Sequence, residues 1–121
     1  MDPEFIQPEE SKEFTTEERC SILEILNNPK DRSQSLARAR VEPGITTAWH
    51  RLKDTTETYY ILNGNGRVEL GEDIVYEVKS GDAVKIPPNT AQRIQNIGSE
   101  DLVFLCFCIP AFGAECYEGL E

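Results

Sequence analysis

The chain is poor in basic residues, and it contains a single histidine. Its 12 lysines and arginines stand against 22 aspartates and glutamates, which gives a formal net charge of −10 at pH 7. Phosphate groups and anionic lipid headgroups repel so acidic a protein. Nucleic acids and membrane surfaces are therefore not expected among its partners.

Long hydrophobic runs are also missing. No stretch of about 18 apolar residues occurs, so no segment is expected to cross a bilayer. The acidic N-terminus lacks the hydrophobic region of a signal peptide. The four cysteines, Cys20, Cys106, Cys108 and Cys116, suit the reducing cytosol, where thiols stay free. We therefore expect a cytoplasmic protein.

No window of the sequence has the 3.6-residue period of an amphipathic helix. Short runs of alternating apolar residues recur instead roughly every 8–12 residues, separated by Gly, Pro, Asn and Asp. The expected strands cover residues 20–26, 34–41, 46–52, 57–62, 67–70, 74–78, 83–86, 91–97 and 102–109. Between two of them, Asn63-Gly64-Asn65-Gly66 predicts a tight hairpin. This pattern predicts an all-β antiparallel sandwich or barrel.

The chain length suits one domain with additional segments at both ends. Residues 1–5 are interpreted as a cloning junction, because Met1-Asp-Pro-Glu-Phe5 can be encoded by DNA that carries two common restriction sites. Residues 6–19 are expected to form a solvated acidic arm. Residues 20–110 are assigned to the barrel, and residues 111–121 to a tail in which Phe112 and Tyr117 are candidate packing anchors.

The histidine and several glycines fall into two spaced motifs. The first reads Gly44-x5-His50-x-Leu52-x4-Glu57-x6-Gly64. The second reads Gly81-x5-Pro87-x-Asn89-x2-Gln92-x3-Asn96. These motifs resemble the two motifs of the cupin family, and the resemblance covers residues 34–109, essentially the whole barrel. The chain looks most like small single-domain cupins that are described as similar to mannose-6-phosphate isomerase.

The resemblance implies an antiparallel double-stranded β-helix, the jelly-roll barrel of cupins. It also implies an internal site at which four side chains hold a divalent metal, and here these positions are His50, Leu52, Glu57 and Gln92. Leucine cannot bind a metal, and an amide oxygen is a weaker ligand than an imidazole. His50, Glu57 and Gln92 are therefore the expected ligands of one weakly bound Mn, Fe, Ni or Zn ion, unless the protein uses no cofactor.

Strand alternation adds a prediction about the cavity. If the barrel closes as the resemblance implies, His50, Glu57, Tyr59 and Gln92 converge on one cavity, a pattern typical of a small-molecule site. A buried carboxylate beside an imidazole also suits acid–base catalysis. A purely structural hydrogen bond between Glu57 and His50 is the alternative.

Arg38 and Arg40 share one face of a strand. We interpret Arg40 as a ligand-binding group for a carboxylate or phosphate. The alternative, preferred for Arg38, is an exposed sheet face or an ion pair with the acidic arm. The N-terminal strands, with an arm that has little core of its own, further suggest a homodimer.

Three functions remain open at this point. The first is a metal-dependent isomerase, lyase or dioxygenase. The second is a metal-free enzyme in which His50 and Glu57 are the general base and acid and Tyr59 is a proton donor. The third is a non-catalytic module that binds or senses a small molecule. Fold alone does not decide among them.

Overall fold

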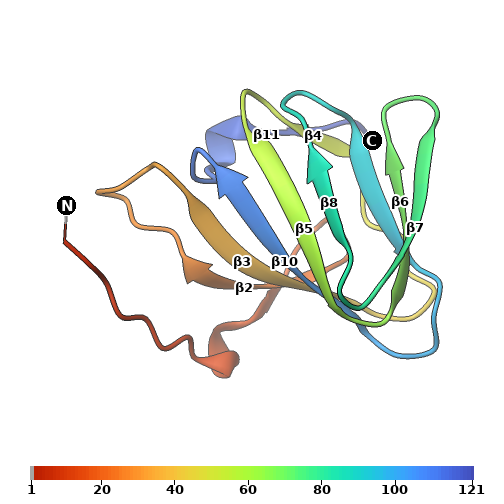
Figure 1. Ribbon diagram of the computed structural model, residues 1–121, viewed down its shortest axis with the longest axis horizontal. Coiled ribbons are helices and arrows are strands. Elements are labelled where there is room, and N and C mark those ends of the chain that lie inside the picture. Colours follow the sequence, from red (N-terminus) through yellow and green to blue (C-terminus); the bar gives the residue numbers. More distant parts are fainter. Residues whose placement is uncertain (1) are drawn as a thin grey trace.

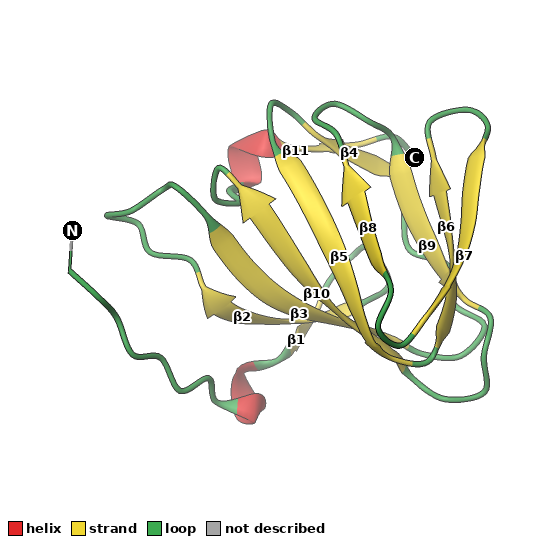
Figure 2. Cartoon of the chain, viewed as in Figure 1, coloured by secondary structure: helices red, strands yellow, loops and turns green. Residues whose placement is uncertain are grey.

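The alternating segments of the chain pair into two antiparallel sheets that face each other (Figures 1 and 2). The computed structural model describes residues 2–121, so Met1 of the suspected cloning junction lies outside the described residues. The first sheet has the order β1 (Phe14–Thr15), β2 (Ser21–Leu26), β3 (Ser35–Val41), β10 (Leu102–Ile109), β5 (Thr56–Asn63) and β8 (Ala83–Ile86). The second has the order β11 (Tyr117–Gly119), β4 (His50–Leu52), β9 (Gln92–Asn96), β6 (Asn65–Leu70) and β7 (Ile74–Lys79).

The core lies between the two sheets. Alternate residues of each strand point inward, so β5 buries Glu57, Tyr59 and Ile61 and β6 buries Val68 and Leu70. The helical segments are two short 3-10 turns, η1 (Glu10–Lys12) and η2 (Ala114–Cys116), and a bilayer-spanning helix is absent from residues 2–121. The predicted all-β double-stranded β-helix is thus confirmed.

The expected closed barrel is not formed. Within residues 2–121 no strand ladder joins the two sheets, and β8 and β7 are edge strands at one side while β1 and β11 are edges at the other. The chain passes between the sheets through short loops, such as the turn from β7 to β8 (Figure 1). The fold is therefore a two-sheet sandwich, whose interior is walled by separate sheets.

The expected hairpin at residues 63–66 is also wrong. β5 pairs with β10 and β8 in the first sheet, whereas β6 pairs with β7 and β9 in the second. Gly64 forms the corner between the sheets with a φ of +92°, and a Cβ there would lie 2.9 Å from the carbonyl oxygen of Asp101. The glycine is needed for this close corner rather than for a hairpin.

Both ends of the chain join the sheets more closely than expected. The acidic arm contains β1, which pairs with β2, and the tail contains β11, which pairs with β4. Arg38 contacts Glu10 at 2.6 Å, and Arg40 contacts Glu13 at 2.8 Å. We call these ion pairs the arm latch, because they hold the arm against the outer face of β3.

One predicted strand is much shorter than expected. Of residues 46–52, only His50–Leu52 belongs to a strand, while Thr46 makes an isolated bridge to Gln95. The Thr47 hydroxyl accepts a hydrogen bond from the Ile94 amide at 3.0 Å, so a side chain replaces part of the backbone ladder. His50 therefore stands at the very start of β4.

Candidate functional site

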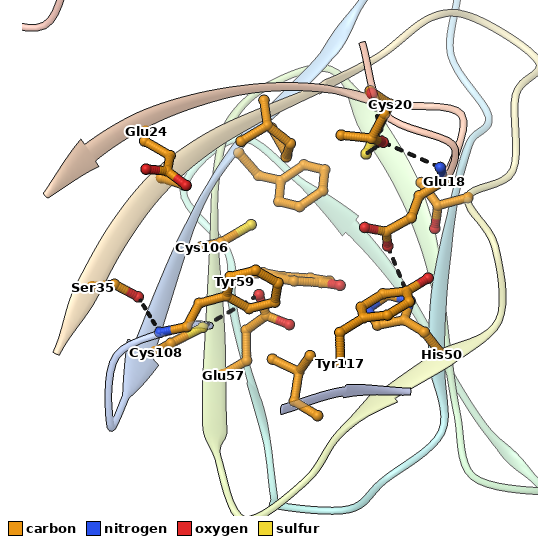
Figure 3. Close-up of a pocket in the computed structure, with 18 of the residues that line it drawn as sticks. Glu18, Cys20, Glu24, Ser35, His50, Glu57, Tyr59, Cys106, Cys108 and Tyr117 are labelled. Atoms are coloured by element: carbon orange, nitrogen blue, oxygen red, sulfur yellow. Dashed lines mark hydrogen bonds and ion pairs between the residues drawn. The ribbon is translucent and has the colours of Figure 1, made fainter. Parts of the chain in front are cut away.

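A cavity of about 430 Å³ lies between the sheets (Figure 3). Its walls come from both sheets, and also from the end of the acidic arm and from the C-terminal tail. Most of the lining is apolar, and His50, Glu57 and Tyr59 are among the polar side chains exposed to it. A mainly apolar hollow with a few polar groups is typical of a small-molecule site.

His50 is held at this wall by contacts on its Nδ1 side. Nδ1 lies 2.9 Å from the carbonyl oxygen of Ala48 and 3.3 Å from Oε2 of Glu18. The ring also stacks on Tyr117, with 5.1 Å between the ring centroids. Because Nδ1 faces two acceptors, it carries the hydrogen of the neutral ring, which leaves the Nε2 lone pair to accept a proton.

Glu57 points into the same cavity from β5. Its Oε2 accepts a weak hydrogen bond from the Cys108 thiol at 3.7 Å, whereas its Oε1 is buried and has no hydrogen-bond partner within residues 2–121. Burial raises the pKa of Glu57, and the neighbouring His50 only partly opposes this effect. The environment thus favours the protonated acid, which can donate a hydrogen bond or a proton.

Tyr59 and Gln92 form a buried pair beside Glu57. The Tyr59 hydroxyl donates to Oε1 of Gln92 at 2.5 Å, and both residues are at most 3% exposed. Burial raises the pKa of Tyr59 well above its ordinary value, with the Glu57 charge acting in the same direction. The tyrosine is therefore a neutral hydrogen-bond donor whose proton is already engaged by Gln92.

The donor atoms at the expected metal positions do not form a metal-binding set. Gln92 Oε1 is engaged by Tyr59, and Leu52 is buried in an apolar cluster with Cys108 and Cys116. Across residues 2–121, no group of three or more His, Cys, Asp or Glu side chains is arranged to hold a metal ion. The residues present therefore do not form the four-ligand metal site that the family resemblance implied, and a weakly bound ion at His50, Glu57 and Gln92 stays a prediction.

The structure brings four predicted site residues together and leaves one apart. His50, Glu57 and Tyr59 line the cavity, and Gln92 contacts Tyr59 from the neighbouring sheet. Arg40 lies on the opposite face of β3, where it binds Glu13 and Asp101. Its ion pairs match the alternative interpretation, contact with the acidic arm.

Glu18 is a cavity residue that the sequence analysis missed. Its carboxyl group points toward the His50 ring (Figure 3), and burial raises its pKa while His50 lowers it. The even-numbered positions Cys20, Ile22 and Glu24 also line the cavity. This alternation, extended backwards by one step, would have identified Glu18, but the surrounding acidic run indicated a solvated arm.

The fold and this internal site define a small cupin. A family model for the cupin domain matches residues 37–108. The chain is also 40% identical over 112 residues to an uncharacterized protein of Methanocaldococcus jannaschii, covering 91% of this chain and 89% of that protein. The chain belongs to the cupin family.

Two further relatives have described roles. The oxalate-binding protein of Thermotoga maritima is 31% identical over 80 residues, which cover 65% of this chain and 64% of that protein. A glucose-6-phosphate isomerase of Sinorhizobium medicae is 36% identical over 73 residues, which cover 57% of this chain and 34% of that protein. The chain therefore spans only about a third of the isomerase.

Solved structures show the same fold. Pac13, described as a nucleoside dehydratase, has a TM-score of 0.77 at 19% identity, over 91% of this chain and 84% of that one. A tyrosine-to-phenylalanine variant of Streptomyces PAC13 with uridine has a TM-score of 0.82 at 21% identity, over 100% of this chain and 93% of that one. At this identity the likeness concerns the fold alone.

Proposed function

We propose that the protein is a small-molecule enzyme of the isomerase or lyase class, in which Glu57 donates a proton and His50 accepts one. The observation that carries this proposal is the buried Oε1 of Glu57, which has no partner among residues 2–121. An unsatisfied buried polar atom costs on the order of 1–3 kcal/mol. A ligand in the cavity is the natural group to satisfy it.

The proposed chemistry uses His50 with a free Nε2 as the proton acceptor and the protonated Glu57 as the proton donor. In an elimination, Nε2 of His50 takes a proton from a carbon next to a carbonyl group, and the electron pair forms the new double bond. Glu57 gives its proton to the hydroxyl group that leaves as water. In an isomerisation, the proton taken from one carbon is replaced at another position. Water loss is also the reaction class in the description of Pac13, a protein whose likeness to this chain concerns the fold.

The other expectations from the sequence concern the reaction class, a bound metal ion and a non-catalytic role. We favour isomerase or lyase chemistry over a dioxygenase because the donor set in the cavity does not fit a redox metal. A single weakly bound Mn, Fe, Ni or Zn ion stays a prediction, which elemental analysis of protein purified without a metal-affinity step can test. A non-catalytic binding module is the second candidate function, favoured by the similarity to an oxalate-binding protein.

The experiment measures proton exchange and water loss after EDTA treatment. The protein is incubated in D2O with a panel of hydroxy-carbonyl compounds and nucleosides, including uridine, and products are followed by NMR and mass spectrometry. Glu57→Gln and His50→Gln are expected to lower turnover about 10²- to 10⁴-fold. Glu42→Gln, at an exposed loop position, is the matched control and should retain the wild-type rate.

Turnover by Glu57→Gln at the wild-type rate would contradict the proposal. Binding without deuterium incorporation or water loss for any compound would favour the non-catalytic module instead. Activity that disappears with EDTA and returns with one divalent metal would support the metal-dependent alternative.

A further inference from the structure

The cavity is lined by acidic side chains, and His50 is the basic side chain among its lining residues. Four glutamates line it, namely Glu17 and Glu18 of the arm, Glu24 of β2 and Glu57 of β5. Neither a lysine nor an arginine lines it in the part of the chain that the structure describes, residues 2–121. The expectation for Arg40 was the opposite, a cationic group that binds a carboxylate or phosphate.

The acidic groups are distributed along the cavity. In Figure 3, Glu24 lies at one end and His50 with Glu18 at the other. Glu17 and Glu24 are exposed acidic residues, which contribute to the negative field around the cavity. An anion therefore meets negative charge along this path even when the buried Glu57 is protonated.

The nearby cations are engaged elsewhere. Arg38 and Arg40 form the arm latch on the outer face of β3. Arg19 donates to the carbonyl oxygen of Thr46 and to Glu121. To reach a ligand in the cavity, each of these side chains would have to break charge-assisted hydrogen bonds.

The hydrogen bonds inside the cavity also disfavour an anionic ligand. The hydrogen on His50 Nδ1 is directed at Ala48 and Glu18, and the Tyr59 hydroxyl donates to Gln92. An anionic ligand needs several donors, and with these two engaged the acid form of Glu57 is the main donor left for it. Acceptors are available by contrast, namely Nε2 of His50 and the carboxyl groups of Glu18 and Glu24.

The other walls suit an apolar or planar body. Phe14, Phe104 and Phe112 line the cavity together with the rings of Tyr59 and Tyr117. Aromatic faces attract both planar rings and cations. The cavity volume of about 430 Å³ lies in the range of small-molecule sites.

We propose that the cavity takes an uncharged or positively charged small molecule, with an apolar or planar body and hydrogen-bond donors, and that it rejects carboxylates and phosphates. This inference rests on the proposed function, since it assumes that the cavity binds a small molecule. It separates this chain from relatives whose names specify oxalate or glucose 6-phosphate.

The test is a competition for the intact protein at neutral pH, read by native mass spectrometry. The mixture contains matched compounds of different charge: uridine and uridine 5′-monophosphate, benzylamine and benzoate, with oxalate and glucose 6-phosphate added. We expect the bound masses to be those of neutral or cationic members, favoured over their anionic counterparts by about tenfold or more.

Two charge-reversal variants test whether charge at the cavity wall determines which compounds bind. Glu24→Lys places a cation at the cavity wall and should shift the bound set toward anions, whereas Glu42→Lys makes the same change at an exposed position outside the cavity and should not. Preferential binding of anions by the wild-type protein would overturn this inference and leave the proposed function standing. Absence of any bound compound would overturn both.

Discussion

At the scale of single residues, the cavity is lined by two groups, His50 and Glu57, whose neighbours determine where His50 carries its hydrogen and how readily Glu57 is protonated. His50 keeps its Nδ1 hydrogen on Ala48 and Glu18, while burial raises the pKa of Glu57. Neither group requires a metal for this arrangement. The incomplete set of metal-binding positions therefore has a physical alternative, an acid and a base that line one cavity from opposite sheets.

The pH dependence of stability should report the buried Glu57. Because its pKa is raised in the folded state, the native protein binds this proton more tightly than the unfolded chain does. The stabilisation is complete below the usual glutamate pKa of about 4.3 and is lost as pH rises through the raised value. Each pKa unit corresponds to about 1.4 kcal/mol.

Glu57→Gln removes this titration. Urea unfolding is measured at a series of pH values. The unfolding free energy of Glu57→Gln, relative to that of the wild type, should increase as pH rises from the ordinary glutamate pKa through the raised pKa of Glu57. The control Glu42→Gln should follow the wild-type curve, because Glu42 is exposed. A constant difference between Glu57→Gln and wild type at all pH values would contradict the raised pKa.

Loss of the Tyr59 hydroxyl should destabilise the core. Tyr59→Phe leaves Oε1 of the buried Gln92 without its donor, which costs about 1–3 kcal/mol. Tyr60→Phe is the matched control, because Tyr60 is 45% exposed on the other face of the same strand. Equal unfolding free energies for the two variants would show that the Tyr59–Gln92 bond does not stabilise the fold.

At the scale of elements, the acidic arm packs against β3 and contributes residues to the cavity wall. The arm latch fixes its outer portion, while Glu18 near its end reaches His50. Charge composition alone suggested a solvated segment. The folded arrangement instead turns part of that charge toward two arginines and part toward the cavity.

Breaking the arm latch should loosen the arm without disrupting the sandwich. Both ion pairs are partly exposed to solvent, so they contribute little to the stability of the whole fold and are weakened by salt. The double variant Arg38→Gln, Arg40→Gln should show faster amide hydrogen exchange over residues 10–20 and only a small change in melting temperature. The control is Arg67→Gln, which removes an ion pair with Glu77 on the other sheet.

Acidification should also speed amide hydrogen exchange over residues 10–20. Arg40 lowers the pKa of Glu13, so the latch is intact above the usual glutamate range and is lost as pH falls through the lowered value. Unchanged exchange over residues 10–20 in the double variant and at acidic pH would contradict the latch.

Most strands were predictable because alternation is a local property of the sequence. The short strands β1 and β11 were missed, since two or three residues carry no pattern and depend on the partners they pair with. The outward direction of Arg40 was visible in its alternation with Ala39 and Val41. Its assignment as a ligand-binding group therefore conflicted with the same pattern that located His50 and Glu57.

At the scale of the whole molecule, the motifs indicated the family but not the closure of the sheets. Short inter-sheet loops and edge strands depend on contacts between distant segments, which periodicity does not encode. The position of the cavity was predictable because it follows from strand faces. Its acidic lining was not, because Glu17 and Glu18 come from outside the expected barrel.

The homodimer, expected from the sequence to pair through the N-terminal strands, stays a prediction, and we propose a second exposed surface as its contact. Tyr60, Leu62 and Ile109 are 45%, 42% and 51% exposed on the outer face of the first sheet. Light scattering with size-exclusion chromatography should show a dimer that Tyr60→Glu with Leu62→Glu converts to a monomer. Ile74→Glu, on the edge strand of the other sheet, should remain dimeric. A monomeric wild-type protein would contradict the prediction.

The most direct test of the central claim is a pH titration of Glu57, followed by carboxyl ¹³C NMR and assigned by comparison with Glu57→Gln. The measurement needs no knowledge of the substrate. If Glu57 is the proton donor of the cavity, its titration midpoint lies above the ordinary glutamate value of about 4.3. A midpoint at or below that value would show an ionised carboxylate and would contradict the acid–base account.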